Sequence, residues 1–354
     1  MRIGIIGAGG VARGIHLPGF RLCPDAEIAV LCEPDAQAAK TAGVEETCAD
    51  YRDVLRRRDV DAVVVATPNF LHREIVLAAL AAGKHVLCEK PLALRRTDAE
   101  EMLRAAERSG RVHMTAFTYR YTPAIQYARR LVEQGELGDL RTVRAAYLMA
   151  LSGHVLGWRS EKRLAGSGVL ADIGSHLVHL VQWLAGDIRA LTATERRFRD
   201  DPTSDVEDWL AFLAEFSSGA CGTFEISRVA PGRGAGITEE IFIELYGTRG
   251  SLAFSLQDPW GLLVARGEDA HDSARPLRHY DVPQEFCKLT GSPRDIHAHD
   301  RRWGYRYDQA FQFVESVKLG QSRAPSFADG VRCQAVLDAV LESAQSKSWV
   351  EVRY

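Results

Sequence analysis

Short apolar runs alternate with helical patterns along the first 120 residues of the chain. Five runs rich in β-branched and other apolar residues are predicted strands: Arg2–Ile6, Glu27–Cys32, Asp61–Ala66, Lys84–Cys88 and Arg111–Ala116. The segments between them are predicted helices: Val11–Leu22, Asp35–Ala42, Tyr51–Arg57, Leu71–Ala82 and Thr97–Ser109. Strands that are apolar on both faces are typical of a parallel sheet between two layers of helices, so we expect a doubly wound α/β domain over residues 1–120. Glu100 follows Thr97 at the spacing of a capping box, which makes Thr97 the expected N-cap of the last helix.

The pattern changes after about residue 120, where apolar and polar residues alternate. The predicted strands here are Arg141–Leu151, Ala190–Phe198, Asp208–Phe216, Cys221–Val229, Glu240–Tyr246 and Gly250–Leu256. The predicted helices are Pro123–Gln134, Ser175–Leu184, Tyr307–Leu319 and Phe327–Ser346, and residues 257–304 have little periodicity and are expected to form loops. Short turns such as Ser218-Gly219 favour an antiparallel sheet. We therefore expect a second, α+β domain over residues 121–354, built on a large, mostly antiparallel open sheet.

The composition is that of a folded protein and excludes a disordered one, with 46% hydrophobic and 26% charged residues in a chain of 354. Forty-four Lys and Arg balance 47 Asp and Glu to a net charge of −3, which gives no electrostatic reason to expect a nucleic acid or a membrane surface as partner. No run approaches the ~18 uncharged apolar residues of a membrane span. The chain opens directly into glycines, without the apolar region of a signal peptide, and its seven scattered cysteines include no CxxC pair. Both features favour a cytoplasmic protein with reduced thiols.

The segment Gly7–Ala12 (GAGGVA) lies between a predicted strand and a predicted helix. It fits the dinucleotide-binding pattern G-x-G-x-x-G/A, in which the first glycine permits a tight turn and the second lets the backbone approach a pyrophosphate at the helix N-terminus. Glycine turns are common, so the alternative is an ordinary loop. In this strand–turn–helix context the motif predicts a Rossmann domain in which Gly7, Gly9, Gly10 and Val11 bind the dinucleotide.

Glu33 ends the second predicted strand. A carboxylate at this place accepts hydrogen bonds from the ribose hydroxyls of the adenosine half and repels a 2′-phosphate. No lysine or arginine occurs at positions 34–36 to bind such a phosphate. Glu33 therefore favours NAD over NADP, with a solvated acid at the strand end as the alternative.

Polar residues also follow the third and fourth predicted strands, and the carboxyl ends of parallel strands line the ligand crevice of an open α/β sheet. The residues expected to contact the cofactor here are Thr67, Pro68, Asn69, His72, Glu89 and Lys90. Lys90 follows an apolar strand and precedes Pro91, so we expect its position to be restricted. The alternative for Lys90 alone is a surface lysine in a turn.

Asp172 and His176 lie four residues apart in the glycine-rich block Gly166–His179. On a helix, residues at this spacing share a face, and a carboxylate beside an imidazole sets its tautomer and raises its basicity. Such pairs also occur in purely structural roles, and Gly174 between them weakens a regular helix. The pair is a candidate acid/base site.

Together, GAGGVA at the N-terminus, ATPN with His72, the Glu89–Pro91 segment EKP and the DxGSH block ending at His176 resemble the Gfo/Idh/MocA oxidoreductases over nearly the whole chain. The resemblance implies a Rossmann domain followed by an α/β domain whose open sheet face commonly forms homodimers or homotetramers. It also implies NAD(P)-dependent oxidation or reduction of sugars or inositol-like cyclitols. Lys90 would then contact the reacting hydroxyl and the nicotinamide ribose, with the Lys90–Pro91 bond often cis, while Asp172 orients the site and His176 is the general acid/base.

One position departs from the family pattern, because many members have an aspartate where this chain has His179. His179 is either a replacement donor or a helix residue that faces the sheet. The candidate substrate-binding residues are Arg120, Trp158, Arg159, Asp172 and His176, with structural packing as the alternative for the first two. His297, His299 and Asp300 share one loop, but such polar loop residues are usually solvated and no metal site is predicted.

The combined expectation is an NAD(P)-dependent dehydrogenase that prefers NAD and acts on a CH–OH group, a secondary hydroxyl or ketone of a sugar, sugar derivative or cyclitol. Two alternatives are an NAD-retaining glycoside hydrolase of the same fold and a regulator that only senses the dinucleotide. The joint presence of Lys90, Asp172 and His176 argues against a sensor, which needs no acid/base pair. Apolar residues on both faces of the strands at 211–214 and 241–243 predict a homo-oligomer, since the predicted helices cover one face only.

Overall fold

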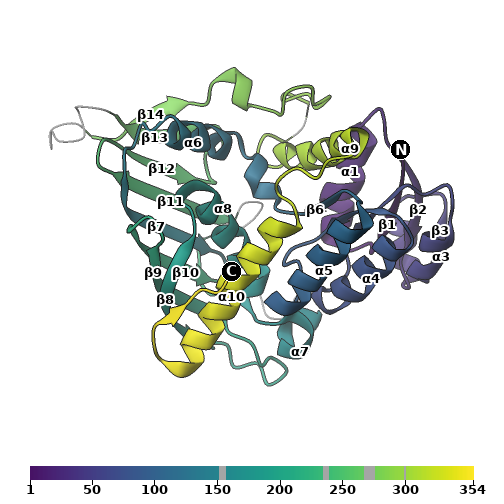
Figure 1. The fold of residues 1–354 in the computed structure, drawn as a ribbon, viewed down its shortest axis with the longest axis horizontal. Helices are drawn as coiled ribbons and strands as arrows, with labels where there is room; N and C mark the ends of the chain where they lie inside the picture. Colours follow the sequence, from purple (N-terminus) through teal and green to yellow (C-terminus); the bar gives the residue numbers. More distant parts are fainter. Residues whose placement is uncertain (151–156, 234–238, 267–275, 299) are drawn as a thin grey trace. The chain divides into compact units, whose positions relative to one another are not determined.

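The computed structural model describes residues 1–150, 157–233, 239–266, 276–298 and 300–354. This part of the chain divides into two compact units (Figure 1). The first unit contains Met1–Thr118 and Lys288–Gln334, and the second contains Tyr119–Cys287 and Ala335–Tyr354. The expected boundary at residue 120 is close to the first break, but residues 288–334, which we assigned to the second domain, group with the first unit. As separate domains, residues 1–120 and 121–354 stay a prediction.

A six-stranded sheet organises the first unit. Its strands are β1 (Arg2–Ile6), β2 (Glu27–Cys32), β3 (Thr47–Cys48), β4 (Ala62–Val65), β5 (His85–Cys88) and β6 (His113–Thr115). They lie in the order β3-β2-β1-β4-β5-β6, and every neighbouring pair is parallel. The direction of winding reverses between β1 and β4, and ligands of such sheets bind outside the carboxyl ends of the strands at this point. The predicted doubly wound Rossmann sheet is confirmed.

Helices cover both faces of this sheet, because alternate strand residues point to opposite sides. The helical elements are the π-helical turn η1 (Ala12–His16), α1 (Leu17–Leu22), α2 (Ala36–Thr41), α3 (Tyr51–Arg56), α4 (Asn69–Ala81), α5 (Arg96–Ser109), the 3-10 turn η8 (Gly304–Tyr307) and α9 (Asp308–Leu319). Ile5 packs in one apolar cluster with Phe20 of α1 and Phe313 of α9, while Val65 packs with Met102 of α5 in the other. The Phe20 and Phe313 rings meet edge to face with centroids 6.3 Å apart. Residues 288–334 therefore group with the first unit because α9 completes one of its two cores.

Two expectations about helix starts need correction. The helix α5 begins at Arg96 with Arg95 at the N-cap position, and no side chain caps it, so the predicted capping box at Thr97 is wrong. Glu100 instead pairs with the Arg96 guanidinium at 2.5 Å, one turn away along the helix. The predicted continuous helix from Val11 is a π-helical turn followed by α1, because Pro18 has no N–H to donate to the turn before it.

The second unit contains a nine-stranded sheet in the order β14-β13-β12-β11-β7-β10-β9-β8-β15. Its strands are β7 (Leu140–Leu148), β8 (Ile188–Arg196), β9 (Trp209–Phe216), β10 (Cys221–Ser227), β11 (Glu240–Gly247), β12 (Ser251–Ser255), β13 (Gly261–Ala265), β14 (Arg278–Asp281) and β15 (Val350–Glu351). Only β7 and β10 pair in parallel, so the predicted large, mostly antiparallel sheet is confirmed. The end of the predicted strand Arg141–Leu151 lies outside the described residues at position 151.

The prediction that residues 257–304 form only loops is wrong, because β13 and β14 fall within them. All four residues of β14 are exposed, so the strand has no apolar alternation that a sequence pattern would show. Its place in the sheet depends on backbone pairing with β13.

Helices lie on one face of the nine-stranded sheet (Figure 1). The helical elements of the unit include α6 (Pro123–Glu133), the 3-10 turn η4 (Gly157–Ser160), α7 (Lys162–Ala165), the π-helical turn η5 (Leu170–Gly174), α8 (Ser175–Ala185), the 3-10 turn η7 (Gln284–Phe286) and the second part of α10 (Phe327–Ser346). A Cβ atom on Gly174 would lie 2.7 Å from Ile226 Cδ1, so this glycine allows η5 to sit directly on β10. The run Lys162–Ala185 has the length and hydropathy of a membrane-crossing helix, but 83% of its most apolar window is buried within the protein.

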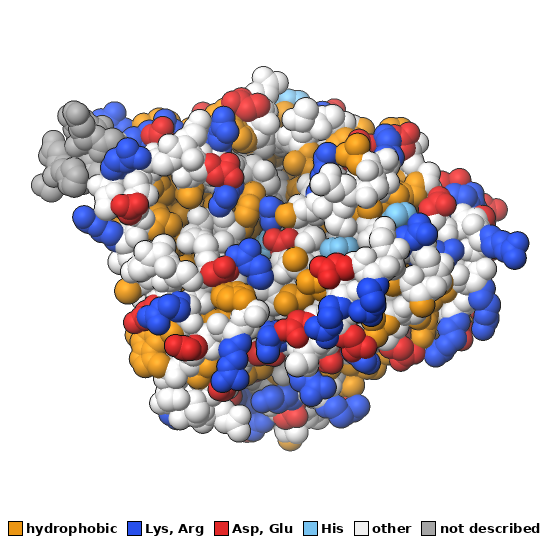
Figure 2. Space-filling view, in the orientation of Figure 1, with side chains coloured by type: hydrophobic (Ala, Val, Ile, Leu, Met, Phe, Trp, Pro, Cys, Tyr) orange, Lys and Arg blue, Asp and Glu red, His pale blue; other side chains and the backbone are white. Residues whose placement is uncertain are grey.

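Charges of both signs are interspersed over the face shown in Figure 2, where Lys and Arg side chains alternate with Asp and Glu. Many charged side chains at the surface of the described residues form exposed ion pairs, such as Arg52 with Glu74 at 3.2 Å. Exposed pairs of this kind contribute little to stability, typically about 0–1 kcal/mol each. The apolar clusters described above therefore dominate the stability of the fold.

His113 joins β6 to the start of α10 inside the first unit. Its Nδ1 accepts the N–H of Phe327 at 3.1 Å, and the two rings lie with centroids 4.9 Å apart. The side chain is buried, and this burial lowers its pKa from 6.5 to about 4.

We expect this histidine to make the free energy of unfolding depend on pH. The unfolded chain binds a proton at His113 below pH 6.5 and the folded chain only below about pH 4, so stability is fully present above pH 6.5 and falls between these values, by up to about 3 kcal/mol. His113→Asn keeps an acceptor near the Nδ1 position but does not titrate. Urea unfolding at pH 7 and pH 4.5 should show a smaller loss of stability for the variant than for the wild type. An equal loss in both proteins would contradict the assignment.

Candidate active site

The glycine loop between β1 and η1 has the backbone that dinucleotide binding needs. Gly7 has φ +102°, and its N–H donates to the carbonyl of Cys32 at 2.8 Å. A Cβ atom here would lie 2.5 Å from the carbonyl oxygen of Ala66, so only glycine fits. At Gly9 and Gly10 a Cβ atom would meet nothing within 4 Å, which leaves open space beside the backbone. This tight turn with free space at the start of a helical segment fits a pyrophosphate, and Val11 leads from it into η1.

Glu33 is fixed against this loop. Its carboxylate accepts the N–H of Ala8 at 2.8 Å and the N–H of Asp35 at 3.1 Å. The side chain is half-buried, so it is not the freely solvated acid that was the alternative. Each oxygen of a carboxylate accepts more than one hydrogen bond, which leaves both oxygens able to accept from a ribose hydroxyl.

Glu89 and Lys90 follow β5 and are tied to η1 through a histidine that the sequence analysis missed. Glu89 Oε1 lies 2.8 Å from Nε2 of His16, and Oε2 accepts the N–H of Lys90 at 3.1 Å. Burial raises the pKa of Glu89, but the hydrogen bond and charge of His16 and the neighbouring Lys90 outweigh it, so the pKa is lowered overall. Glu89 thus links the glycine-loop segment to the backbone of Lys90. The Lys90–Pro91 peptide is cis.

His72 has a positioning role in the turns that follow β4 and β5. Its ring is fully buried, and its two nitrogens lie 3.0 Å from the carbonyl oxygens of Pro91 and Thr67. Burial lowers its pKa. Because its nitrogens face backbone carbonyls, His72 connects the two turns and does not present a nitrogen to a ligand.

The other residues of the turn after β4 remain candidates for cofactor contact. Pro68 precedes α4, whose first residue is the buried Asn69. Thr67 Oγ1 is buried and has no hydrogen-bond partner within the described ranges. This hydroxyl is thus a candidate donor to a bound group.

Asp172 and His176 lie on one continuous helical run in the second unit. Asp172 is in the π-helical turn η5, and His176 is in the first turn of α8. His176 is buried, and its ring meets the Tyr119 ring edge to face with centroids 4.7 Å apart. Gly174 does not interrupt the run. It lies where η5 contacts β10, and a side chain at this position would clash with Ile226. The structure therefore gives the pair the helical setting that the spacing suggested.

Arg159 connects the turn η4 to this pair. Its Nε lies 3.3 Å from Asp172 Oδ1, and its guanidinium carbon lies 4.4 Å from the centre of the Trp158 ring. Arg159 thus contacts both its neighbour Trp158 and Asp172, and all three are among the predicted substrate-binding residues. The guanidinium of Arg120 lies 4.0 Å above the ring of Trp183 in α8.

Tyr119 and Glu239 extend the site beyond the predicted residues. The Tyr119 hydroxyl donates to the Glu239 carboxylate and lies 3.3 Å from the hydroxyl of Tyr147. Tyr119 therefore joins an acid at the start of β11 to the ring of His176. The sequence analysis selected neither Tyr119 nor Glu239 as a site residue, since no local spacing links residues 120 positions apart.

Comparison with known proteins identifies the family. The description "Oxidoreductase family, NAD-binding Rossmann fold" matches residues 1–117, and "GFO/IDH/MocA C-terminal domain" matches residues 125–253. The chain belongs to the Gfo/Idh/MocA oxidoreductases. Residues 1–117 of its first unit are their NAD-binding domain, as the glycine loop and Glu33 indicated.

Among its Gfo/Idh/MocA relatives, the levoglucosan dehydrogenase of Pseudarthrobacter phenanthrenivorans is 34% identical, over 90% of this chain and 86% of that protein. The D-apiose dehydrogenase of Paraburkholderia graminis is 30% identical, over 99% of this chain and 89% of that protein. A solved structure of levoglucosan dehydrogenase in complex with NADH and levoglucosan has a TM-score of 0.90 and 31% identity, with both chains fully covered. The chain is therefore an NAD-dependent oxidoreductase, and these relatives are dehydrogenases of sugars.

Three further expectations for this Gfo/Idh/MocA chain concern His179, the loop histidines and a metal. His179 is buried in α8, as is His176 three residues before it, so its role as a replacement donor or as a packed helix residue stays a prediction. His297 is exposed, Asp300 pairs with Arg302 at 2.9 Å, and His299 lies outside the described residues. Within the described ranges no three metal-ligating side chains gather, and the expectation of no metal stays a prediction.

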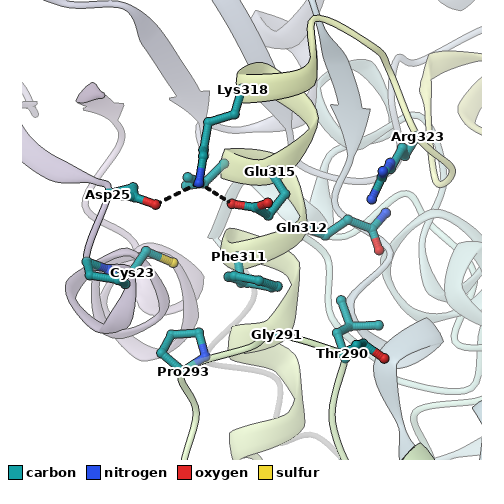
Figure 3. Close-up of a pocket in the computed structure, with 13 residues that line it drawn as sticks. Cys23, Asp25, Thr290, Gly291, Pro293, Phe311, Gln312, Glu315, Lys318 and Arg323 are labelled. Atoms are coloured by element: carbon teal, nitrogen blue, oxygen red, sulfur yellow. Dashed lines mark hydrogen bonds and ion pairs between the residues drawn. The ribbon is translucent and has the colours of Figure 1, made fainter.

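A pocket of about 540 Å³ lies in the first unit, away from the glycine loop (Figure 3). Figure 3 shows Lys318 of α9 between Asp25 and Glu315, with a 2.8 Å ion pair to each. Asp25 precedes β2, so this pocket is at the amino ends of the parallel strands. The predicted cofactor residues follow the carboxyl ends of the same strands, and none of them lines this pocket.

Proposed function

We propose that Asp172 and His176 are the acid/base site of a dehydrogenase that interconverts a secondary hydroxyl and a ketone of a sugar, sugar derivative or cyclitol. The observation that carries this is the buried His176 on one helical run with Asp172, whose carboxylate is held by Arg159. The sugar relatives of the chain support the substrate class, since levoglucosan and D-apiose are both polyhydroxylated.

Each of the site residues has a separate role in the proposed reaction. In the oxidative direction, an imidazole nitrogen of His176 takes the proton of the reacting hydroxyl. Asp172, fixed by Arg159, orients the imidazole and the substrate. Trp158 and Arg159 supply an aromatic surface and hydrogen-bond donors to a sugar, and Arg120 is a further candidate for this role. Bound NAD supplies the hydride acceptor.

Lys90 is assigned to the same reaction from the first unit. Its ammonium group stabilises negative charge on the substrate oxygen as the proton leaves. Gly7, Gly9, Gly10 and Val11 are assigned to the pyrophosphate, and Glu33 to the adenosine ribose. Thr67, Pro68, Asn69 and Glu89 line the cofactor crevice, with His72 behind them. The chain thereby binds and orients both reactants and moves one proton.

The role of His176 predicts a large loss of turnover. His176→Ala should lower kcat by roughly 10²–10⁴ and leave the dissociation constant for NADH nearly unchanged, because the ring acts on the substrate proton. Lys90→Ala should lower kcat similarly and also weaken cofactor binding, and Asp172→Asn should fall between. The measurement is NADH absorbance at 340 nm, with a panel of aldoses, anhydro-sugars and polyols as substrates. His279→Ala, which removes an exposed histidine of β14, is the matched control.

Several results would contradict this assignment. If His176→Ala keeps more than about a tenth of wild-type kcat, another group takes the proton, and Lys90 becomes the first candidate. A glycoside cleaved without net NADH would indicate a hydrolase that retains its cofactor, and dinucleotide binding without turnover of any sugar would indicate a sensor. The pH profile of kcat/KM should rise as one group loses its proton, and the His176 variant should lack this rise.

Glu33 predicts the choice of cofactor. Its carboxylate, held by the Ala8 N–H, favours ribose hydroxyls and repels a 2′-phosphate, so kcat/KM should be higher with NAD than with NADP. Glu33→Ala combined with Pro34→Arg should narrow the difference. Steady-state kinetics in which the wild type uses NADP as well as NAD would contradict the role of Glu33.

The open face of the nine-stranded sheet supports a homodimer or homotetramer. Leu213 of β9, Tyr246 of β11 and Leu263 of β13 are 50%, 37% and 40% exposed, and α6 and α8 pack on the opposite face. Apolar side chains on a broad sheet face favour burial against a second copy. The free thiols of all seven cysteines support a cytoplasmic location for this assembly.

Light scattering at micromolar concentration should report a dimer or tetramer. Leu213→Arg should shift the protein toward smaller species, because it places a charge on the proposed contact face. Leu319→Arg, on an equally exposed leucine of α9 (57%), is the control that should leave the assembly unchanged. A monomeric wild type would refute the proposal.

A further inference from the structure

The helical run that carries Asp172 and His176 begins with backbone N–H groups that need acceptors from outside the helix. Glu207 supplies most of them. Its Oε2 accepts the N–H of Gly168 at 2.8 Å, and its Oε1 accepts the N–H of Leu170 at 3.1 Å. The backbone carbonyl of Glu207 accepts the N–H of Val169 at 3.3 Å. One residue, distant in sequence, thus binds three consecutive N–H groups.

The next two N–H groups are satisfied within the run itself. Ser167 Oγ accepts the N–H of Ala171 at 3.0 Å, and the carbonyl of Gly168 accepts the N–H of Asp172 at 3.1 Å. The N–H groups of residues 168–172 therefore all have acceptors. Asp172 is thus the first of these residues whose N–H donates to a backbone carbonyl four residues earlier, as in a regular helix.

Gly168 is needed for this arrangement because Glu207 lies against it. A Cβ atom on Gly168 would be 2.1 Å from the carbonyl oxygen of Glu207 and 3.0 Å from its nitrogen. The neighbour is backbone, which cannot move aside as the end of a flexible side chain can. The second glycine of the segment Gly166–Gly168 is thus explained by contact with Glu207.

The segment around Glu207 is itself held rigidly. The carboxylate of the fully buried Asp208 accepts Nε of Arg199 at 2.7 Å and Nε of Arg228 at 3.0 Å. It also accepts the N–H groups of Phe198 and Arg199 at 3.1 and 2.9 Å. These bonds tie the end of β8 to the starts of β9 and the loop after β10. The residue that follows Glu207 in the chain is therefore held by a buried charge network.

We propose that Glu207 is a positioning residue for the reaction, which sets where Asp172 and His176 stand relative to the sheet of the second unit. This inference rests on the proposed function, because Glu207 affects the reaction only if Asp172 and His176 are the acid/base site. Glu207 is buried and does not itself touch the substrate in this proposal. Both of its oxygens accept backbone N–H groups, so an amide in its place would turn an NH₂ group toward one of these donors.

The test compares Glu207→Gln with Gly168→Ala, which disturb the same contact from its two sides. Each should lower kcat on the order of 10²-fold, since a displacement of about 1 Å costs this much at a catalytic site. The dissociation constant for NADH, measured by fluorescence, and KM for the sugar should change by less than about threefold. The double variant should lose no more activity than the worse single variant, because the contact is already broken. Glu195→Gln, a half-buried glutamate of β8, is the matched control and should keep wild-type kcat.

A second measurement does not depend on activity. Hydrogen exchange of the amides of residues 168–170 should accelerate at least tenfold in Glu207→Gln, while the strands of the sheet keep their protection. Unchanged exchange, or kcat above half of wild type, would overturn the inference. Additive losses in the double variant, or a parallel loss of kcat, NADH binding and melting temperature, would also overturn it in favour of general destabilisation. A wild-type protein that oxidises no sugar would refute the proposed function, and the exchange measurement would still decide whether Glu207 holds the run.

Discussion

Glycine-rich loops leave backbone N–H groups without the partners that a regular helix or strand supplies, and an unpaired buried donor costs about 1–3 kcal/mol. Both units of this chain meet this constraint with a glutamate that approaches from the end of a strand or from the loop beside it. Glu33 accepts the N–H of Ala8 in the glycine loop, and Glu207 accepts those of Gly168 and Leu170. The placement of the cofactor loop and of the acid/base helix thus depends on the same kind of bond.

Close backbone contacts explain why the loops contain glycine at two particular positions. Gly7 is forced by its positive φ and by Ala66, and Gly168 by the backbone of Glu207. At Gly9 and Gly10, in contrast, nothing in the protein fills the space beside the backbone. Glycines in one motif therefore serve two different needs: some permit the chain to pack against itself, and others leave room for a ligand.

Much of the fold could be predicted from sequence because its strands are short apolar runs with clear ends. Arg2–Ile6 and Glu27–Cys32 were predicted with the bounds that the structure has. The exposed β14 escaped prediction because edge pairing needs no apolar pattern, and the cap at Thr97 failed because Glu100 has a nearer partner in Arg96. The packing of α9 on the Rossmann sheet could not be predicted either. Its apolar face shows that the helix is packed against a core but not against which domain.

The residues of the candidate site likewise divide into those that could be predicted from sequence and those that could not. Asp172, His176 and Lys90 were selected because their motifs are local, and Arg159 proved to contact Asp172. Glu207, Glu239 and His16 were missed, because each acts through a residue 37 or more positions away. His72 was selected for cofactor contact, yet its two nitrogens face backbone carbonyls. Local spacing identifies the groups that do chemistry more readily than those that hold them in place.

Because residues 288–334 belong to the first unit, this unit is completed late during synthesis on the ribosome. Phe20 and Ile5 lie in a core that is completed only by Phe313, which emerges some three hundred residues after them. Until then, that side of the nascent Rossmann sheet lacks part of its cover, and the side that contains Met102 still lacks Phe327 and Val331 of α10. Both faces of the sheet are therefore completed only when residues 288–334 have emerged, and until then the growing chain presents apolar surface on both faces to chaperones and to other chains.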